Sequence, residues 1–378
     1  MSSGQPSTPG RPLRIVFCWA EVTGYMAACW QELARRPGID LHILHTEQLT
    51  EQEPPFHLGP LLSGLSHQPF AKGIANVDSW LLEQVANRRP DVVVFCGWIF
   101  WPYTRLLSAK VLEPATMVLG MDSPWRGTAA QRLARFRLRQ IVRHTDLVIT
   151  AGERSAEYAK RMGIDEQRIR SGYYGFDYDR FSPVADRRPS GAGQWPRQFL
   201  FAGRYVEQKD LGTLMSAYAE YRRGVANPWG LTCCGTGEAA WLLCQQPGVT
   251  DAGFTQPAEQ PGVFARHGAF VLASKFEPWG VVLAEAAASG MPLVCTTACG
   301  AAADLVRPYY NGLITTAGDV AGLARALRWI HDHEEELPAM GRRGQAFAAA
   351  FSAQAWAARW QQYLLETVEQ VSLARVKR

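Results

Sequence analysis

The sequence predicts an α/β protein with two tandem domains, each built on a doubly wound parallel sheet. Short apolar runs alternate with amphipathic stretches in both halves, as expected of βα units. The length of 378 residues exceeds that of one typical core. Residues 186–198 combine Pro, Gly and charge without periodicity, so they are the expected linker.

Each expected strand is a short apolar run that is followed by a helical or irregular segment, the pattern of Rossmann-like domains. In the first domain, residues 13–185, the strands are expected at 13–19, 41–45, 91–96, 116–121 and 146–150. In the second, residues 199–351, they are expected at 199–203, 229–235, 249–254, 269–274 and 292–297. Ligands of such sheets bind beyond the carboxyl ends of the strands, so two facing domains predict a cleft between them.

The two ends of the chain differ in character. Residues 1–12 have no apolar segment and are the expected disordered tail. In the last segment, residues 352–378, Trp356, Trp360 and Leu364 recur at helical spacing. We therefore expect a C-terminal helix that packs back on the domains.

Composition limits the class of protein. Hydrophobic residues make up 47% and charged residues 20%, the balance of a soluble globular enzyme. No apolar run reaches the roughly 18 to 20 residues that span a bilayer, and none of the eight cysteines forms a CxxC pair. The net charge of +4 is too small to indicate nucleic-acid binding. We expect a cytoplasmic protein without a disulfide framework or a zinc site.

Two glutamates follow a strand in the segment SKFEPWGVVLAEAAASGMPLV, residues 274–294. Glu277 lies in the expected loop, and Gly280 opens a helix that carries Glu285 among alanines. The N-terminus of such a helix binds phosphate or hydroxyl groups, because its first backbone N–H groups have no intrahelical acceptor. A carboxylate among small apolar residues needs a partner. Ribose hydroxyls of a ligand are the partner we expect for Glu285.

Two cations follow the first strand of the second domain, in FLFAGRYVEQKDLGTL. Arg204 and Lys209 bracket a short loop before a helix, where guanidinium and ammonium groups would face the same cleft. Such a pair suits a phosphate group.

Taken together, these motifs resemble those of retaining glycosyltransferases of family 4, which have the two-domain GT-B fold. The match covers nearly the whole chain and is strongest from Phe199 to Ile314. The resemblance implies that Arg204 and Lys209 are catalytic residues that bind the diphosphate of a nucleotide sugar. It implies that Glu277 is also a catalytic residue, which holds hydroxyls of the donor sugar, and that Glu285 holds the ribose.

The resemblance extends to the rest of the donor site. It implies that the loop amides of Trp279 and Gly280 orient sugar and phosphate, and the expected donor site also includes Gly24, Gly235 and Phe254. The chain departs from the family at Ala301, which follows Gly300 where paired glycines are common, and at Asp304, where a glutamate is common.

The reaction that the resemblance implies is transfer of a sugar from a UDP- or GDP-sugar to a hydroxyl of a glycan, glycolipid or lipid-linked acceptor. Retention would come from front-face departure and attack, without a covalent intermediate, and domain closure would exclude water. Neither a cofactor nor a metal is expected, because the two cations neutralise the leaving diphosphate. Cell-envelope polysaccharide synthesis is the expected setting.

One acidic pair has a second interpretation. Asp177 and Asp179, in GFDYDRFSP, form an Asp-x-Asp pattern that binds metal in glycosyltransferases of another fold. The segment resembles the family's Gly-x-Asp-x-x-x-Phe-x-Pro, so we interpret the pair as a structural turn before the linker.

Three alternative functions remain at this stage. One is a nucleotide-sugar-binding protein without transfer activity, and another is a sugar-nucleotide epimerase, which would act without an acceptor. The third is a dinucleotide-dependent oxidoreductase, since CCGTGEAA satisfies a loose G-x-G-x-x-A pattern after a strand. Asp251 comes too early to be the acidic residue that such a site requires.

The first domain is expected to bind the acceptor. Asp122, Trp98 and Trp125 follow two of its strands and are candidate acceptor contacts, although core packing also explains the tryptophans. The next segment, residues 129–144, is expected to be one amphipathic helix. Its cationic face carries Arg132, Arg135, Arg139 and Arg143. Contact with an anionic membrane and a solvated helix face both explain this stripe.

Overall fold

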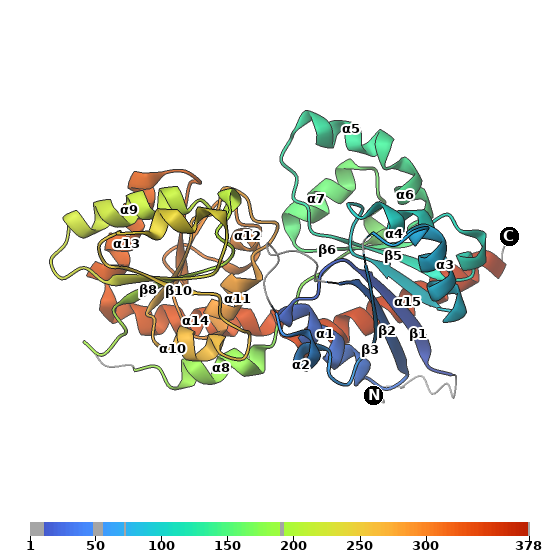
Figure 1. Ribbon diagram of the computed structural model, residues 1–378, viewed down its shortest axis with the longest axis horizontal. Helices are drawn as coiled ribbons and strands as arrows, with labels where there is room; N and C mark the ends of the chain where they lie inside the picture. The colour runs from blue at the N-terminus through green and yellow to red at the C-terminus, as the bar shows by residue number, and fades with distance from the viewer. Residues whose placement is uncertain (1–10, 48–55, 72, 190–192, 377–378) are drawn as a thin grey trace, which may run out of the picture.

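The protein consists of two lobes that lie side by side (Figure 1). The computed structural model describes residues 11–47, 56–71, 73–189 and 193–376. Most of the expected N-terminal tail and part of the expected linker lie outside these residues. All strands of both sheets run parallel, so the predicted fold class is confirmed.

The first lobe has a seven-stranded sheet in the order β3-β2-β1-β4-β5-β6-β7. Its strands are β1 Leu13–Trp19, β2 Ile39–Thr46, β3 Ser66–Phe70, β4 Val92–Phe95, β5 Thr116–Met121, β6 Leu147–Thr150 and β7 Ile169–Ser171. Its helices are α1 Gly24–Ala34, α2 Leu58–Leu62, α3 Val77–Asn87, α4 Trp101–Leu106, α5 Ala129–Arg137, α6 Arg139–His144 and α7 Glu153–Arg161. The strand order reverses between β1 and β4, where ligands of doubly wound sheets bind.

The second lobe repeats this plan with six strands in the order β10-β9-β8-β11-β12-β13. Its strands are β8 Gln198–Ala202, β9 Gly230–Cys234, β10 Val249–Gly253, β11 Ala269–Leu272, β12 Leu293–Thr296 and β13 Gly312–Thr315. Its helices are α9 Leu211–Arg223, α10 Gln260–Ala265, α11 Val281–Ala288, α12 Ala301–Leu305, α13 Val320–Asp332 and α14 Leu337–Ala348. The reversal lies between β8 and β11.

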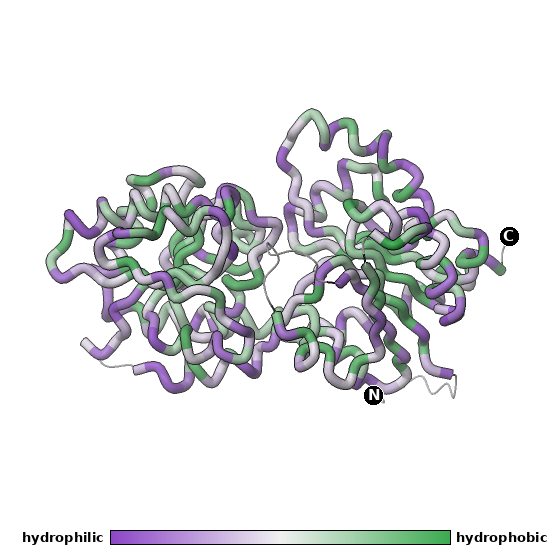
Figure 2. Tube along the Cα trace, in the orientation of Figure 1, coloured by the Kyte–Doolittle hydropathy of each residue, from purple (hydrophilic) through white to green (hydrophobic). Residues whose placement is uncertain are grey.

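The central strands are buried because helices cover both faces of each sheet. Every residue of β4 and β11 is buried, and the hydrophobic strands run through the middle of both lobes in Figure 2. The eight cysteines are free thiols, and five of them have no exposed surface: Cys18, Cys29, Cys233, Cys295 and Cys299. Among the described residues, no helix is long and apolar enough to cross a membrane.

The chain crosses between the lobes earlier than the sequence suggests. Helix α8, Tyr178–Asp186, falls within the expected first domain, yet it packs on α10, α11 and α14 of the second lobe (Figure 1). Phe181 on α8 lies 5.3 Å from Phe264 between ring centroids. Part of the expected linker runs along the second lobe as well, because Trp195 Nε1 donates to the Gly268 carbonyl at 2.9 Å. The first crossing therefore precedes α8.

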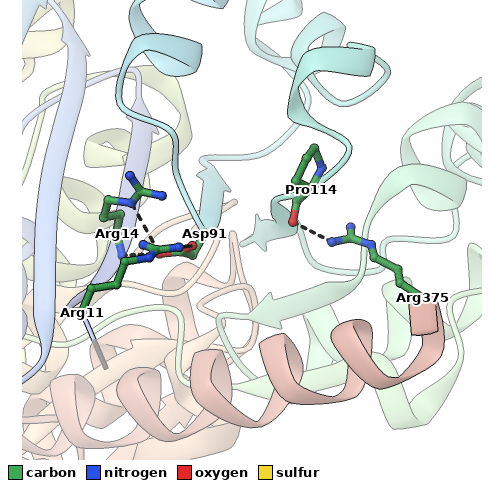
Figure 3. Close-up of polar contacts among 5 residues, drawn as sticks. All are labelled: Arg11, Arg14, Asp91, Pro114 and Arg375. Atoms are coloured by element: carbon green, nitrogen blue, oxygen red, sulfur yellow. Dashed lines mark hydrogen bonds and ion pairs between the residues drawn. The ribbon is translucent and has the colours of Figure 1, made fainter. Parts of the chain in front are cut away.

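The second crossing returns the chain to the first lobe. Helix α15, Ala353–Val376, packs along α1, and Trp356 and Trp360 stack within the first lobe at 4.6 Å between ring centroids. Figure 3 shows the far end of α15, where Arg375 donates to the carbonyl of Pro114 at 2.6 Å. In the same view Arg11 pairs with Asp91 beside the sheet. The first-lobe core is thus completed by the last helix.

The expected cationic helix 129–144 is not continuous. It is two helices, α5 and α6, with a break at Leu138, whose φ and ψ are −96° and 8°. The prediction of one continuous helix over the segment was therefore wrong, and the four arginines of the predicted cationic face are all exposed. Arg132 and Arg135 lie on α5, and Arg139 and Arg143 lie on α6.

Candidate functional site

A cavity of about 300 Å³ lies between the two lobes. It borders both strand-order reversals, because residues after β1, β8 and β11 contribute to its walls. It brings together every residue that the sequence suggested for catalysis or donor binding. These are Gly24, Arg204, Lys209, Gly235, Phe254, Glu277, Trp279, Gly280 and Glu285.

Lys209 and Glu277 form an ion pair at the cavity wall. Their side chains are only 14% and 13% exposed. They meet because β8 and β11 are adjacent strands, and because the loops that follow are tied together: the Lys275 amide donates to the Gln208 carbonyl at 2.9 Å. Arg204 stands on the same loop, is exposed and lines the cavity. This part of the cavity wall therefore has the two cations Arg204 and Lys209 and the carboxylate of Glu277.

The loop that carries Glu277 ends in a helix N-terminus that faces the cavity. Gly280 adopts a φ of +101° just before α11, a conformation that favours glycine. The amides of Val281 and Val282, the first two residues of α11, have no acceptor within the helix, whereas the Leu283 amide donates to the Gly280 carbonyl at 3.0 Å. Both valines line the cavity. Backbone donors and the positive end of the helix dipole are thus directed to the same space as the cations.

Glu285 lies one turn further along α11 and is buried. Burial raises the pKa of its carboxyl to about 7, which Arg180 counteracts and Asp177 increases. Its helix neighbours are alanines with no exposed surface. A carboxylate in this setting is costly unless hydrogen-bond donors reach it.

Asp177 opens a helix instead of forming the expected turn. Its carboxylate accepts from the Arg180 amide at 3.2 Å and pairs with the Arg180 guanidinium at 2.9 Å, so it caps α8. Both residues line the cavity. Sequence reasoning missed Arg180, and the signal for it was its position three residues after a helix-capping aspartate.

The glycine of the β9 loop is required by a close approach of two backbones. A Cβ at Gly235 would lie 2.0 Å from the Gly203 carbonyl oxygen. This loop therefore packs against the loop of Arg204. Phe254, after β10, packs edge-to-face on Phe56 of the first lobe at 5.4 Å between ring centroids, and Gly24 fits against Pro257. These contacts form one rim of the cavity.

The carboxylate of Asp251 is not part of the cavity lining, whereas a dinucleotide site requires an acidic residue that binds ribose. It accepts from the Tyr205 hydroxyl at 2.8 Å and from the Gly253 amide at 2.9 Å. The G-x-G-x-x-A pattern after β9 thus lacks its acidic partner, which counts against the oxidoreductase alternative.

The candidate acceptor residues do not line the cavity. Trp98 and Trp125 pack on Tyr158, at 6.0 Å and 5.6 Å between ring centroids, and neither belongs to the described cavity lining. Asp122 is close to the cavity without lining it, and accepts from the Tyr174 hydroxyl at 2.8 Å. Burial raises the pKa of Asp122, which the Tyr174 hydrogen bond opposes.

Apart from Gly24, the first-lobe wall of the cavity comes from residues that sequence reasoning missed. Glu21 and Tyr25 follow β1, and Tyr174 follows β7. Tyr25 lies near three carboxylates, those of Glu21, Asp122 and Glu277, and burial is the main cause of its raised pKa. A position just beyond a parallel strand was the available signal for Glu21 and Tyr174.

Two family models match the chain, one for each lobe. The glycosyl transferase 4-like domain matches residues 21–175, and the glycosyl transferases group 1 model matches residues 185–347. The chain is 30% identical over 257 residues to glycogen synthase of Mycobacterium tuberculosis, covering 65% of this chain and 61% of that protein. It is 28% identical over 264 residues to D-inositol 3-phosphate glycosyltransferase of Streptomyces coelicolor, covering 59% and 58%. The chain thus aligns with about three fifths of each relative.

Solved structures resemble the whole molecule. HepE of Anabaena in complex with UDP has a TM-score of 0.73 at 18% identity, over 93% of this chain and 100% of that chain. A glycosyltransferase of Rickettsia africae has a TM-score of 0.75 at 13% identity, over 94% and 99%. Likeness at this level of identity shows a shared two-domain architecture.

Proposed function

The chain belongs to the group 1 glycosyl transferases and has their GT-B fold, and we propose that it transfers a sugar from a nucleoside diphosphate sugar to a hydroxyl group with retention. One observation carries the proposal: Arg204, Lys209, Glu277 and Glu285 line a single interlobe cavity. Cations on the diphosphate would also serve a protein that only binds nucleotide sugars, so donor turnover is the measurement that separates the two functions.

The two cations act on the departing diphosphate. Negative charge grows on the β-phosphate as the bond to the sugar breaks, and Lys209 and Arg204 stabilise it. Lys209 leaves its ion pair with Glu277 to do so. The glutamate is then free to accept from hydroxyls of the donor sugar, while the amides of Val281 and Val282 bind phosphate oxygens.

The hydroxyl acceptor enters from the first-lobe side. Glu21, Tyr25 and Tyr174 form that wall, with Asp122 behind Tyr174. Asp122 accepts a hydrogen bond from the Tyr174 hydroxyl and so fixes the orientation of this side chain in the wall that contacts the acceptor. Attack occurs on the face from which the diphosphate leaves, which retains the anomeric configuration.

A UDP-sugar is the donor we favour, because the structural relative HepE is in complex with UDP. A GDP-sugar remains the second choice. We propose a hexose as the transferred sugar and a glycan, glycolipid or lipid-linked acceptor of the cell envelope. The proposed compartment is the cytoplasm, at the inner face of the membrane.

Donor turnover tests the proposal. The protein is incubated with UDP-, GDP- and ADP-sugars without added metal, and nucleotide release and thermal shift are followed. We expect one donor class to raise the melting temperature and to be slowly hydrolysed, with hydrolysis lost in Glu277→Ala. Stabilisation without any turnover, with or without glycan acceptors, would instead favour the binding protein.

Donor affinity is expected to depend on pH through Glu285. Ribose hydroxyls donate to the carboxylate, so the donor binds the charged form, which gains population as pH rises through about 7. Because affinity changes about tenfold per pH unit below the pKa, Kd at about pH 6 is expected to be about tenfold higher than at about pH 8. Calorimetry with a UDP-sugar measures this change.

The sign is opposite for stability of the free protein. A carboxyl whose pKa is raised from 4.5 to about 7 stabilises the fold below its ordinary pKa, and this contribution is lost as pH rises through about 7. Glu285→Gln is the control, and both pH dependences should disappear in it. A Kd that is unchanged across this range in the wild type contradicts the ribose role.

We also propose that α5 and α6 contact an anionic membrane. Residues 123–145 contain six arginines and no acidic residue. Leu133 and Phe136 on α5 are 57% and 63% exposed between these arginines, and Ala134 is the buried residue of the helix. Helix α5 stands at the outer edge of the first lobe (Figure 1). Exposed apolar side chains among arginines suit an interface with anionic headgroups.

Vesicle sedimentation tests this contact. We expect binding to phosphatidylcholine vesicles that contain phosphatidylglycerol, and little binding to phosphatidylcholine alone. Each arginine contributes about 1 kcal/mol at such a surface, so Arg135→Ala with Arg139→Ala should weaken binding about 30-fold. Arg11→Ala with Arg36→Ala is the matched control. Equal binding to both vesicle types would contradict the proposal.

A further inference from the structure

We propose that Asp304 is a positioning residue for sugar transfer, which fixes the loop of Trp279 to the first lobe when the cleft is closed. The inference rests on the proposed transferase function. Asp304 lies on α12, outside the cavity lining, at the position where the resemblance leads one to expect a glutamate. Its contacts on both sides of the lobe boundary carry the argument.

The carboxylate of Asp304 joins two elements from different lobes. Its Oδ2 accepts from Trp279 Nε1 at 2.7 Å, within the second lobe. Its Oδ1 accepts from the amide of Glu153 at 3.3 Å, at the start of α7 in the first lobe. Helices α12 and α7 face each other across the boundary in Figure 1. The positive end of the α7 dipole favours a carboxylate at this point.

Gly152 makes this approach possible. A Cβ at Gly152 would lie 1.9 Å from Asp304 Oδ2 and 2.8 Å from its Cγ. Glycine is needed here for space, because its backbone is extended and requires no special conformation. Any side chain at position 152 would push the carboxylate away from Trp279 and Glu153. At this contact the second lobe therefore contributes the carboxylate of Asp304, and the first lobe contributes Gly152, which has no side chain.

Besides its hydrogen bond to Asp304, Trp279 has a direct contact with the first lobe. Its ring lies 6.1 Å from that of Tyr174, whose hydroxyl donates to Asp122 at 2.8 Å. The indole is fully buried, with Phe351 at 4.9 Å. The position of this indole is thus set jointly by both lobes.

The loop of Trp279 contains the groups that face the donor. Glu277 and Gly280 flank it and line the cavity. The loop is attached to the start of α12, because the Ala301 amide donates to the Trp279 carbonyl at 2.7 Å and the Gly300 amide to the Glu277 carbonyl at 3.1 Å. When the lobes separate, Asp304 loses the Glu153 amide and Trp279 loses Tyr174. The loop is fully fixed only in the closed protein.

This predicts an effect on the rate of transfer rather than on nucleotide affinity. Arg204, Lys209 and Glu285 belong to the second lobe and bind nucleotide without the first. Misplacement of a reacting group by about 1 Å costs up to about a hundredfold in rate. We therefore expect Asp304→Ala and Gly152→Ala each to lower kcat for transfer by about ten- to a hundredfold. The Kd for UDP should change by about threefold or less.

A double-variant cycle sharpens the test. If the two residues act through one contact, Asp304→Ala combined with Gly152→Ala should be no slower than the worse single variant. The control is Gly59→Ala on α2, where an added Cβ meets no atom within 4 Å. Losses that multiply in the double variant, or equal losses of UDP affinity and kcat, would overturn the proposal.

Hydrogen exchange gives a readout that needs no activity. The Glu153 amide should exchange faster in Asp304→Ala than in the wild type, measured in a peptide that covers residues 152–158. Unchanged exchange there would overturn the contact itself. A wild-type protein that turns over no donor would contradict the proposed function, and exchange would then decide the Asp304 contact on its own.

Discussion

Replacing Lys209 by alanine is expected to lower kcat for sugar transfer by about 10²- to 10³-fold, the loss seen when one group that stabilises a developing anion is removed. The ammonium lies at the cavity wall in an ion pair with Glu277, and both side chains are largely shielded from water. Shielding strengthens its interaction with a leaving diphosphate. Because charge on the diphosphate grows in the transition state, kcat should fall more than KM rises.

The neighbouring loop offers a matched control for this variant. Lys275 pairs with Asp210 at 3.1 Å, is 53% exposed and lies outside the cavity lining. Lys275→Ala removes the same charge close by and should leave kcat unchanged within about twofold. Similar losses in both lysine variants would mean that the net charge of the cleft matters and that the position of Lys209 does not. Initial rates over a range of donor concentrations separate kcat from KM.

Trp356→Ala is expected to reduce the free energy of unfolding by about 3–5 kcal/mol, the range for loss of a buried large aromatic side chain. Trp356 has no exposed surface, stacks on Trp360 and donates through Nε1 to the Tyr173 carbonyl at 2.9 Å. Gly175 approaches so closely that a Cβ there would lie 2.8 Å from Trp356 Cβ. The cavity left by alanine therefore has rigid walls that close only in part.

Urea unfolding followed by circular dichroism measures the change. Leu365→Ala on the same helix is the control, because Leu365 is 49% exposed and its loss should cost about 1 kcal/mol or less. If Trp356→Ala lowered stability no more than this control, the packing of α15 on the first lobe would not be a main source of its stability. If the two lobes unfold in separate transitions, a shift of one transition to lower urea concentration with the other unchanged would assign the loss of stability to the first lobe.

The strands that sequence reasoning found have buried residues on both faces, except β10, an edge strand without a buried residue that was still predicted at residues 249–254. Apolar runs predicted the central strands of both sheets, including β4 and β11, in which every residue is buried. It missed β3, β7 and β13, which are all edge strands. Strand β3 reads SHQPF, with Phe70 as its one buried residue, and β7 is three residues long without a buried residue. Edge strands have fewer buried positions, so the hydrophobic pattern that reveals a strand is absent.

The same reasoning explains which part of the site was predictable. Arg204, Lys209 and Glu277 lie just after adjacent parallel strands, so strand order alone brings them together. The positions of Tyr25 and Arg180 in the cavity depend on how the lobes face each other and on where the chain crosses between them. No local sequence pattern encodes either feature. The break between α5 and α6 at Leu138 was also missed, because Leu138 fits the apolar spacing of an unbroken helix.

The two crossings between the lobes lie next to each other. The Phe176 amide donates to the Phe351 carbonyl at 3.1 Å, and the Ala353 amide donates to the Phe176 carbonyl at 2.8 Å. The first crossing at Phe176 and the second at Ser352 therefore form a short parallel bridge.

A single connecting strand would let the lobes swivel and tilt in every direction. Two strands fixed side by side restrain twist and sideways displacement, and leave bending across the pair as the easy motion. The cleft then opens and closes along one direction of bending. Each closure restores the same contacts between the residues that face each other across the cleft. If the chain were cut near residue 186, at the end of α8, this restraint would be lost. The first fragment would lack α15, and the second fragment would carry α15 without the first lobe on which it packs.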